Sequence, residues 1–195
     1  IKKEILLLTA IISLILGMGL PTTANYIVVS SLIAPVIVSL GAANDLAIPL
    51  IAAHMFVFYY GVASSLTPPV AIAAYAAAPI AGSNPLLTAF MAFRLGMAKF
   101  IIPFIFAFYP TILIVEEFHL ATFVWIIIRT MFCIWLFSSA LSAFDRGKLT
   151  MFEVVSRFIA AFAILTLSPL IHLPAIGFGI CLIVWDMMRN NEKKN

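Results

Sequence analysis

The chain has 195 residues, of which 64% are hydrophobic and only 10% carry a charge, and its mean hydropathy is +1.17. A water-soluble domain of this size could not bury that much apolar surface, so the composition indicates a polytopic integral membrane protein of the all-α class. The net charge of +3 does not point to nucleic acid, because the charges are scattered in short loops and at helix ends. Cys133 and Cys181 lie inside apolar runs, so we expect neither a disulfide nor a metal site there.

The first hydrophobic region is two apolar arms, residues 5–16 and 26–40, separated by the polar and glycine-rich stretch 17–23. The arms have 12 and 15 residues, or roughly 18 and 22 Å of helix, whereas a full membrane span needs about 20 residues. Glycine permits the backbone of a tight turn and Pro21 stops a helix, so we predict a re-entrant helical hairpin. Thr22 or Thr23 would cap its second arm. One long helix with a Gly/Pro kink is the alternative.

A second break, Ser64-Ser65-Leu66-Thr67-Pro68-Pro69, interrupts the apolar run 46–82. Hydrocarbon offers no water to satisfy free backbone groups, so such a break survives at membrane depth only where protein or a polar cavity surrounds it. We therefore predict a discontinuous helix made of residues 46–63 and 70–81. Thr67 would be the N-cap of its second half and Pro68 would lie in the first turn.

The rest of the chain predicts further spans at residues 86–109, 122–141, 152–170 and 176–188, the last two joined by His172-Leu173-Pro174. A polar group of Glu116, Glu117 and His119 marks the exit after the first of these. Basic residues cluster at 146–157 and 189–194, which places both regions in the cytoplasm. We divide the chain into a re-entrant hairpin (1–41), a discontinuous helix with the following transmembrane helix (42–110), and C-terminal helices with a cytoplasmic tail (111–195).

The two breaks predict one binding site. A helix N-terminus presents unpaired N–H groups and partial positive charge, and a helix C-terminus presents free carbonyls, so each break offers both at one depth. The N-termini near Thr22 and Thr67 suit an anionic group, and the carbonyls around residues 17–19 and 63–66 suit Na⁺. The expected substrate and ion site comprises Gly17, Gly19, Thr22, Thr23, Asn25, Ser64, Ser65, Thr67 and Pro68, with Na⁺ ligands expected among Gly17, Gly19, Ser65 and Thr67.

Four other polar side chains fall within apolar runs. His54 faces either a lumen or a hydrogen-bonded packing contact, and a lone membrane histidine is more often the latter. Arg94 and Lys99 lie near the end of their predicted span, where they can reach the lipid headgroups; Arg94 could alternatively meet a substrate carboxylate. Arg129 is deeper, which predicts either a pair with an acidic group in a region missing from this chain or a position facing a wet seam.

Four stretches carry a family resemblance: residues 16–28 (LGMGLPTTANYIV), 53–61 (AHMFVFYYG), 66–71 (LTPPVA) and 82–85 (GSNP). Over residues 5 to about 110 the chain closely resembles the large membrane subunit of tripartite ATP-independent periplasmic (TRAP) transporters, above all the fused form in which small and large membrane subunits are one polypeptide. The glycine-rich turn matches the tip of that family's re-entrant hairpin, and the Leu-Thr-Pro-Pro motif matches the unwound part of the next helix. Both belong to the second of two inverted repeats that move as an elevator.

The resemblance implies Na⁺-driven import of a small organic solute, often a carboxylate such as a C4-dicarboxylate, across a bacterial or archaeal inner membrane. It implies no cofactor beyond the coupling ion, and as partners a periplasmic solute-binding protein, a small membrane subunit and the lipid bilayer. The first repeat is missing here, so we expect this to be the C-terminal part of a longer permease that does not transport alone. Beyond residue 120 the sequence is generic.

Three other classes of membrane protein are alternatives to a transporter. An intramembrane protease would have to use Ser64 or Ser65 with His54, which lie close to three helical turns apart, so we do not expect an enzyme. A purely structural or assembly subunit would predict that substitutions at Thr67 alter assembly and not ion dependence. A channel would not require the matching hairpin and broken helix.

Overall fold

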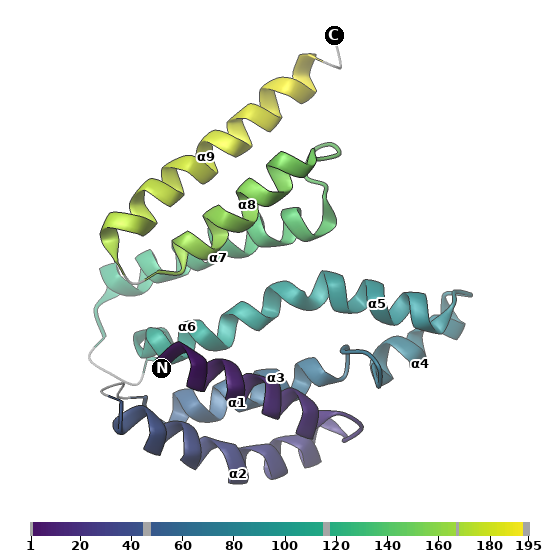
Figure 1. Cartoon of the computed structure of the whole chain (residues 1–195), viewed down its shortest axis with the longest axis vertical. Coiled ribbons are helices and arrows are strands. Elements are labelled where there is room, and N and C mark those ends of the chain that lie inside the picture. Colours follow the sequence, from purple (N-terminus) through teal and green to yellow (C-terminus); the bar gives the residue numbers. More distant parts are fainter. Residues whose placement is uncertain (1, 45–47, 115–117, 167, 193–195) are drawn as a thin grey trace. The chain divides into compact units, whose positions relative to one another are not determined.

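The computed structural model describes residues 2–44, 48–114, 118–166 and 168–192, and over these ranges the chain forms helices joined by short turns and no β-sheet (Figure 1). Contacts divide the chain into two compact units, Ile1–Phe123 (unit 1) and Val124–Asn195 (unit 2). Predictions about Asp45, Leu46, Glu116 and Glu117 lie outside the described residues.

Unit 1 opens with a helical hairpin. Helices α1 (Lys2–Gly17) and α2 (Thr22–Ala42) pack side by side and run in opposite directions (Figure 1), which confirms a hairpin in place of one kinked helix. The turn uses Gly19 at a φ of +84°, a conformation that glycine adopts without a steric penalty. The second arm was predicted too short: α2 has 21 residues, because the helix starts directly after Pro21 and continues through Gly41.

The predicted discontinuous helix is present with different boundaries. Helix α3 (Leu50–Ser64) ends at the break, and α4 (Ile72–Ile80) begins only after it. The prediction of Thr67 as N-cap and Pro68 in the first turn was wrong, since Ala71 is the N-cap residue and has a left-handed backbone with φ +31°. The break is therefore longer at its C-terminal side than the sequence suggested.

The span predicted at residues 86–109 consists of three consecutive pieces. Asn84 is the N-cap of helix α5 (Pro85–Gly96), and its side chain accepts hydrogen bonds from two backbone N–H groups. One turn of 3₁₀ helix, η1 (Met97–Ile101), then leads into α6 (Ile102–Phe108), and η2 (Pro110–Leu113) follows. Together residues 85–108 are long and apolar enough to cross a membrane.

The core of unit 1 lies where α1, α2, α3 and α6 meet. Phe56 of α3 is fully buried and its ring lies edge-on to Phe104 of α6, while Tyr60 donates a 2.7 Å hydrogen bond to the carbonyl of Phe100. Val29 and Ile37 from α2 and Leu6 from α1 complete this cluster. Because α3 contacts all of these elements, they hold the end of α3 beside the hairpin turn.

Unit 2 contains the remainder of α7 (Leu120–Ser142), then α8 (Met151–Ile164) and α9 (Pro169–Glu192). Helix α7 matches the predicted span 122–141. The predicted turn at His172-Leu173-Pro174 was wrong, because α9 begins at Pro169 and continues through Pro174. A proline near the start of a helix loses few hydrogen bonds, and membrane helices tolerate it.

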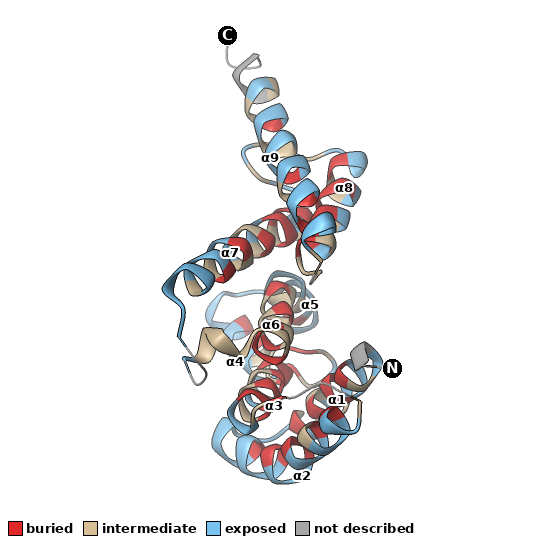
Figure 2. Cartoon of the chain, turned by 90° about the vertical axis from the view of Figure 1, so that its left-hand side faces the viewer, coloured by how far each residue is buried: buried red, intermediate tan, exposed pale blue. Residues whose placement is uncertain are grey.

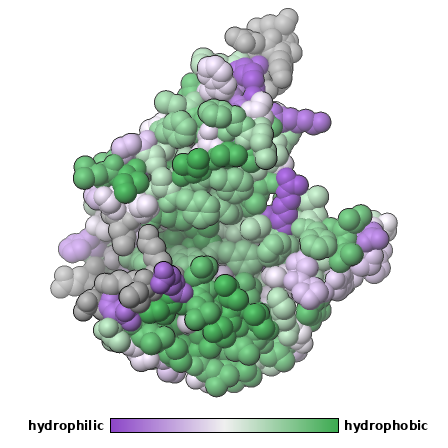
Figure 3. Space-filling model, viewed as in Figure 1, coloured by the Kyte–Doolittle hydropathy of each residue, from purple (hydrophilic) through white to green (hydrophobic). Residues whose placement is uncertain are grey.

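Four described segments are long and apolar enough to span a bilayer: Thr22–Ala42, Pro85–Phe108, Leu120–Ser142 and Pro169–Arg189. Helices α3 and α8, with 15 and 14 residues, are shorter. Each long helix buries one side and exposes the other (Figure 2), and hydrophobic side chains cover most of the surface seen in Figure 3. The chain is therefore a polytopic helical membrane protein.

Candidate ion and solute site

Asn25 joins the two predicted breaks. It lies in the first turns of α2, 2% exposed, and its Nδ2 donates to the carbonyl of Gly17 at the end of α1 (3.2 Å) and to the carbonyl of Gly61 in α3 (2.7 Å). Ser64, the last residue of α3, donates its hydroxyl to the same Gly17 carbonyl at 2.8 Å. We call Gly17, Asn25, Gly61 and Ser64 the tip network. It connects the hairpin turn directly to the end of the broken helix.

Close backbone approach makes this network possible. A Cβ atom added to Gly17 would lie 2.6 Å from Asn25 Nδ2 and 2.9 Å from Ser64 Oγ, and one added to Gly61 would lie 2.9 Å from Asn25 Oδ1. Real Cβ atoms essentially never approach that closely. Glycine is therefore required at both positions to let the amide reach two carbonyls. Gly61 was not among the predicted site residues, although a small residue one turn before a helix break was a usable signal.

Two buried polar atoms near the network have no hydrogen-bond partner within the described part of the chain: Asn25 Oδ1 and Ser13 Oγ. Ser13 precedes Gly17 by four residues, so both lie on one face of α1. An unpaired buried polar oxygen costs about 1–3 kcal/mol, and such groups are usually satisfied by water, an ion or a ligand. Asn25 Oδ1 is thus a spare oxygen ligand beside the network, and the Ser13 hydroxyl is both a spare acceptor and a spare donor.

The break after α3 satisfies its own backbone. The hydroxyl of Thr67 donates to the carbonyl of Ala63 (2.9 Å) and that of Ser65 to the carbonyl of Val62 (2.7 Å). The N–H of Ala73 in α4 reaches back to the carbonyl of Ser65 at 3.1 Å. Thr67 failed as an N-cap because its hydroxyl bonds the preceding turn, a competition typical of Ser and Thr at helix ends. Thr67 and Ser65 therefore close the end of α3.

The structure separates the predicted site residues into three groups. Gly17, Asn25 and Ser64 meet in the tip network, and Ser65, Thr67 and Pro68 line the break beside it. By contrast, Gly19, Thr22 and Thr23 are exposed at the hairpin turn. The expected Thr22 or Thr23 cap was wrong, because Pro21 occupies the N-cap position and no side chain caps α2. The roles of all these residues in binding stay predictions.

A second polar contact joins α2 and α3 on a more exposed face. The hydroxyl of Tyr26 lies 3.0 Å from His54 Nδ1, and the Tyr26 ring packs edge-on against Phe58 at a centroid distance of 5.6 Å. His54 is therefore hydrogen-bonded, as the preferred of its two interpretations predicted, and a direct functional role stays a prediction.

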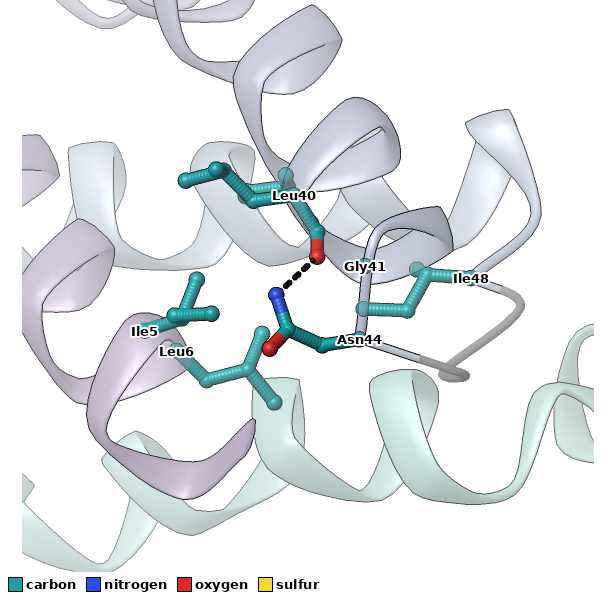
Figure 4. A pocket seen from close by; sticks show the side chains of 7 residues that line it. Ile5, Leu6, Leu40, Gly41, Asn44 and Ile48 are labelled. Atoms are coloured by element: carbon teal, nitrogen blue, oxygen red, sulfur yellow. Dashed lines mark hydrogen bonds between the residues drawn. The ribbon is translucent and has the colours of Figure 1, made fainter. Parts of the chain in front are cut away.

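The pocket in Figure 4 lies elsewhere, where the start of α1 meets the end of α2. It is lined by the apolar side chains of Ile5, Leu6, Ile37, Leu40 and Ile48, with Asn44 as its polar member. The Asn44 amide donates to the carbonyl of Leu40 at 2.8 Å. Its lining is apolar apart from Asn44 and Gly41 and includes no charged side chain, so it does not compete with the tip network as an ion site.

Unit 2 buries a chain of charges of alternating sign, which we call the charge network. Arg157, 1% exposed, pairs with Asp145 at 2.8 Å and faces Asp186 at 3.8 Å. Arg189 pairs with Asp186 and Glu153, each at 2.7 Å. The sequence did not predict this network, because its members come from α8, α9 and the loop after α7.

Glu153 lies in the first turn of α8, a helix that is not among the four candidate membrane spans. Burial alone would raise the pKa of this carboxyl, but hydrogen bonds from the Thr150 N–H and from Arg189 outweigh it and hold the pKa below its usual range. Thr150 and Glu153 also form a capping box.

Arg129 of α7 is buried as well. Its Nη1 lies 3.4 Å from Nδ1 of His172 in α9. Both residues belong to unit 2. An acidic partner outside this chain stays a prediction.

Comparison with known proteins gives one match. Residues 2–120 match the family model described as the tripartite ATP-independent periplasmic transporter, DctM component. The match covers α1 to η2, including both breaks, and stops where α7 begins. No curated protein and no solved structure match the chain.

Proposed function

Because the chain belongs to the DctM family of tripartite ATP-independent periplasmic transporters, we propose that it forms part of a permease that imports a small organic carboxylate with Na⁺. In this proposal a periplasmic binding protein delivers the solute, and a second repeat and the small membrane subunit complete the permease in the inner membrane of a bacterium or archaeon. The elevator movement of the repeat belongs to the same proposal.

The tip network is the observation that supports Na⁺ coupling. Its four members supply only neutral oxygens and one amide, the hard and uncharged ligands that suit a monovalent cation. As the structure stands, the Gly17 carbonyl accepts from both Asn25 and Ser64. A cation can bind this carbonyl only when those donors turn away.

Rotation of the Asn25 amide by half a turn would achieve this. It would move Nδ2 away from the two glycine carbonyls and bring the unpaired Oδ1 toward them. Three oxygens, from Gly17, Gly61 and Asn25, would then converge with the Ser64 hydroxyl beside them. Since two of these groups belong to the hairpin and two to α3, Na⁺ would hold the two breaks together. The anionic end of the solute would then meet the helix N-termini next to the breaks.

The test is uptake of radiolabelled succinate, as the first probe of the carboxylate class, into proteoliposomes that contain the complete permease. Uptake is measured with and without the binding protein, under an inward Na⁺ gradient and under an equal K⁺ gradient. The proposal expects uptake only with Na⁺ and only with the binding protein, and a panel of other carboxylates is used if succinate is not carried. Carboxylate uptake that is indifferent to both would overturn the coupling and the delivery together.

A further inference from the structure

The Tyr26 and His54 pair is the one hydrogen-bonded contact between α2 and α3 that involves a titratable side chain in the described part of unit 1. Tyr26 is 36% exposed, and the His54 ring is half-buried. Their ring centroids lie 6.1 Å apart, and Phe58 fixes the Tyr26 ring from the side. The two polar groups are therefore held in place while their outer edges remain accessible.

This pair is close to the tip network. Tyr26 directly follows Asn25 in α2. In α3, His54, Phe58 and Gly61 follow one another at spacings of four and three residues, so they share one face of the helix. His54 thus lies about two turns, or roughly 10 Å, from the Gly61 carbonyl.

The described titratable groups around His54 lie on the elements packed against α3. The elements packed against α3 are α1, α2, η1 and α6. Among their described side chains, α1 carries Glu4 in its first turn, α2 carries Tyr26, η1 carries Lys99 and α6 has no ionisable group. None of the described carboxylates forms an ion pair with His54.

Hydrocarbon cannot cover such a pair without cost. A hydroxyl or imidazole N–H that loses its hydrogen bond in an apolar medium costs several kcal/mol, roughly 4–8 kcal/mol in transfer to a liquid hydrocarbon. The outer edge of the pair must therefore meet water, protein or a solute, and not lipid tails.

We propose that Tyr26 and His54 form a contact site for a carboxylate group of the imported solute, which rests on the proposed function. An unprotonated Nδ1 accepts the Tyr26 O–H. When His54 takes up a proton, Nδ1–H must donate to the Tyr26 oxygen, which frees the Tyr26 O–H. The freed O–H then donates to a carboxylate oxygen, and the positive imidazolium beside it supplies the attraction between opposite charges. Protonation and carboxylate binding therefore strengthen one another.

The experiment compares four forms of the complete permease with its binding protein in proteoliposomes: the parent, Tyr26→Phe, His54→Gln and Tyr59→Phe. Tyr59→Phe is the matched control, because Tyr59 also lies in α3 and its ring packs on Phe106 without a hydrogen bond to His54. Radiolabelled succinate uptake is measured between about pH 5 and pH 8, the range in which imidazoles titrate. The Na⁺ concentration for half-maximal uptake is measured in parallel.

We expect Tyr26→Phe to raise the KM for succinate about tenfold, the effect of losing one hydrogen bond to a charged group, with the Na⁺ requirement unchanged. In the parent, KM should fall as the pH falls, and His54→Gln, which keeps a donor but cannot titrate, should abolish this dependence. Tyr59→Phe should match the parent.

An unchanged KM in both variants, with the parent pH profile retained, would overturn the proposal. So would a lower yield of assembled permease with an unchanged KM, because it would assign the pair to packing against the other repeat. If the parent carries succinate without Na⁺ while the variants still shift KM, the Na⁺ coupling fails and the contact site stands.

Discussion

Both units bury a polar network among apolar helices, but the two networks differ in charge. The tip network of unit 1 is neutral, made of one amide, one hydroxyl and two backbone carbonyls. The charge network of unit 2 is a chain of three carboxylates and two guanidinium groups. A neutral hydrogen bond contributes about 0.5–1.5 kcal/mol net, whereas an unpaired buried charge costs several kcal/mol. Neutral partners can therefore be exchanged during function, and charged partners must stay together.

The largest effect is expected in the charge network. Arg157→Met should lower the free energy of unfolding of unit 2 by about 3–5 kcal/mol, because Asp145 would lose its partner at 2.8 Å and Asp186, which keeps Arg189, would lose the second positive charge beside it. All three tryptophans, Trp125, Trp135 and Trp185, belong to unit 2, so intrinsic fluorescence during denaturant unfolding of this chain reports on it selectively.

Two companion variants sharpen this result. Arg146→Met removes an exposed charge from the same loop region and should leave the transition unchanged. Adding Asp145→Asn and Asp186→Asn to Arg157→Met should recover much of the lost stability. If Arg157→Met unfolds like the parent, the buried charges are not coupled as the geometry indicates.

The next effect concerns the close approach in the tip network. Gly17→Ala would place a Cβ atom 2.6 Å from Asn25 Nδ2 and should cost about 1–3 kcal/mol through displacement of the Asn25 side chain. Faster amide hydrogen exchange in the first turns of α2 would reveal it. Gly177→Ala is the matched control, since nothing lies within 4 Å of its added Cβ and the gain in helix propensity should make it neutral or slightly stabilising. Equal exchange in both variants would contradict the network.

Asn25→Ala tests whether the amide has a role beyond packing. It removes the donor to Gly17 and Gly61 and also the unpaired Oδ1. We expect a loss of about 1–3 kcal/mol in stability and, in the complete permease, a Na⁺ concentration for half-maximal uptake about tenfold higher. A stability loss with unchanged Na⁺ activation would make the tip network structural.

The smallest effect is expected at the break itself. Thr67→Val keeps the shape of the side chain but removes the hydrogen bond to the Ala63 carbonyl, worth about 0.5–1.5 kcal/mol. The freed carbonyl should weaken the Na⁺ dependence of uptake by a few-fold at most. Ser142→Ala, an exposed hydroxyl at the end of α7, provides the comparison. Unchanged Na⁺ activation in Thr67→Val would remove Thr67 from the ion site.

Glycine and proline residues predicted the positions of the two breaks correctly, but they did not predict the backbone geometry inside the breaks. Gly19 and Pro21 marked the hairpin turn, and the Pro68-Pro69 pair marked the helix break, because these residues restrict the backbone locally. The start of α4 was missed because a left-handed Ala71 has no signal in the sequence. Likewise, Pro174 indicated a turn that the surrounding helix overrides.

The candidate site shows the same limit. Asn25 and Ser64 could be predicted as polar residues beside a break, but their meeting depends on a contact across 39 residues. Gly61 has no polar side chain, and although a small residue just before a break was a signal, its contact with the Asn25 amide could be seen only in the structure. The charge network joins residues 145 to 189, a range over which spacing carries no information about distance.

In the proposed permease, the hydrogen bonds between the hairpin and the broken helix would also limit the leakage of ions. If the turn at Gly17 moved away from Ser64 while facing lipid, two backbone carbonyls and the Asn25 amide would lose their partners in hydrocarbon. Such a movement is affordable only where water or an ion replaces each lost bond. In the proposed permease the hairpin would therefore separate from α3 only on a side that water or an ion reaches, and the membrane would stay sealed when neither is present.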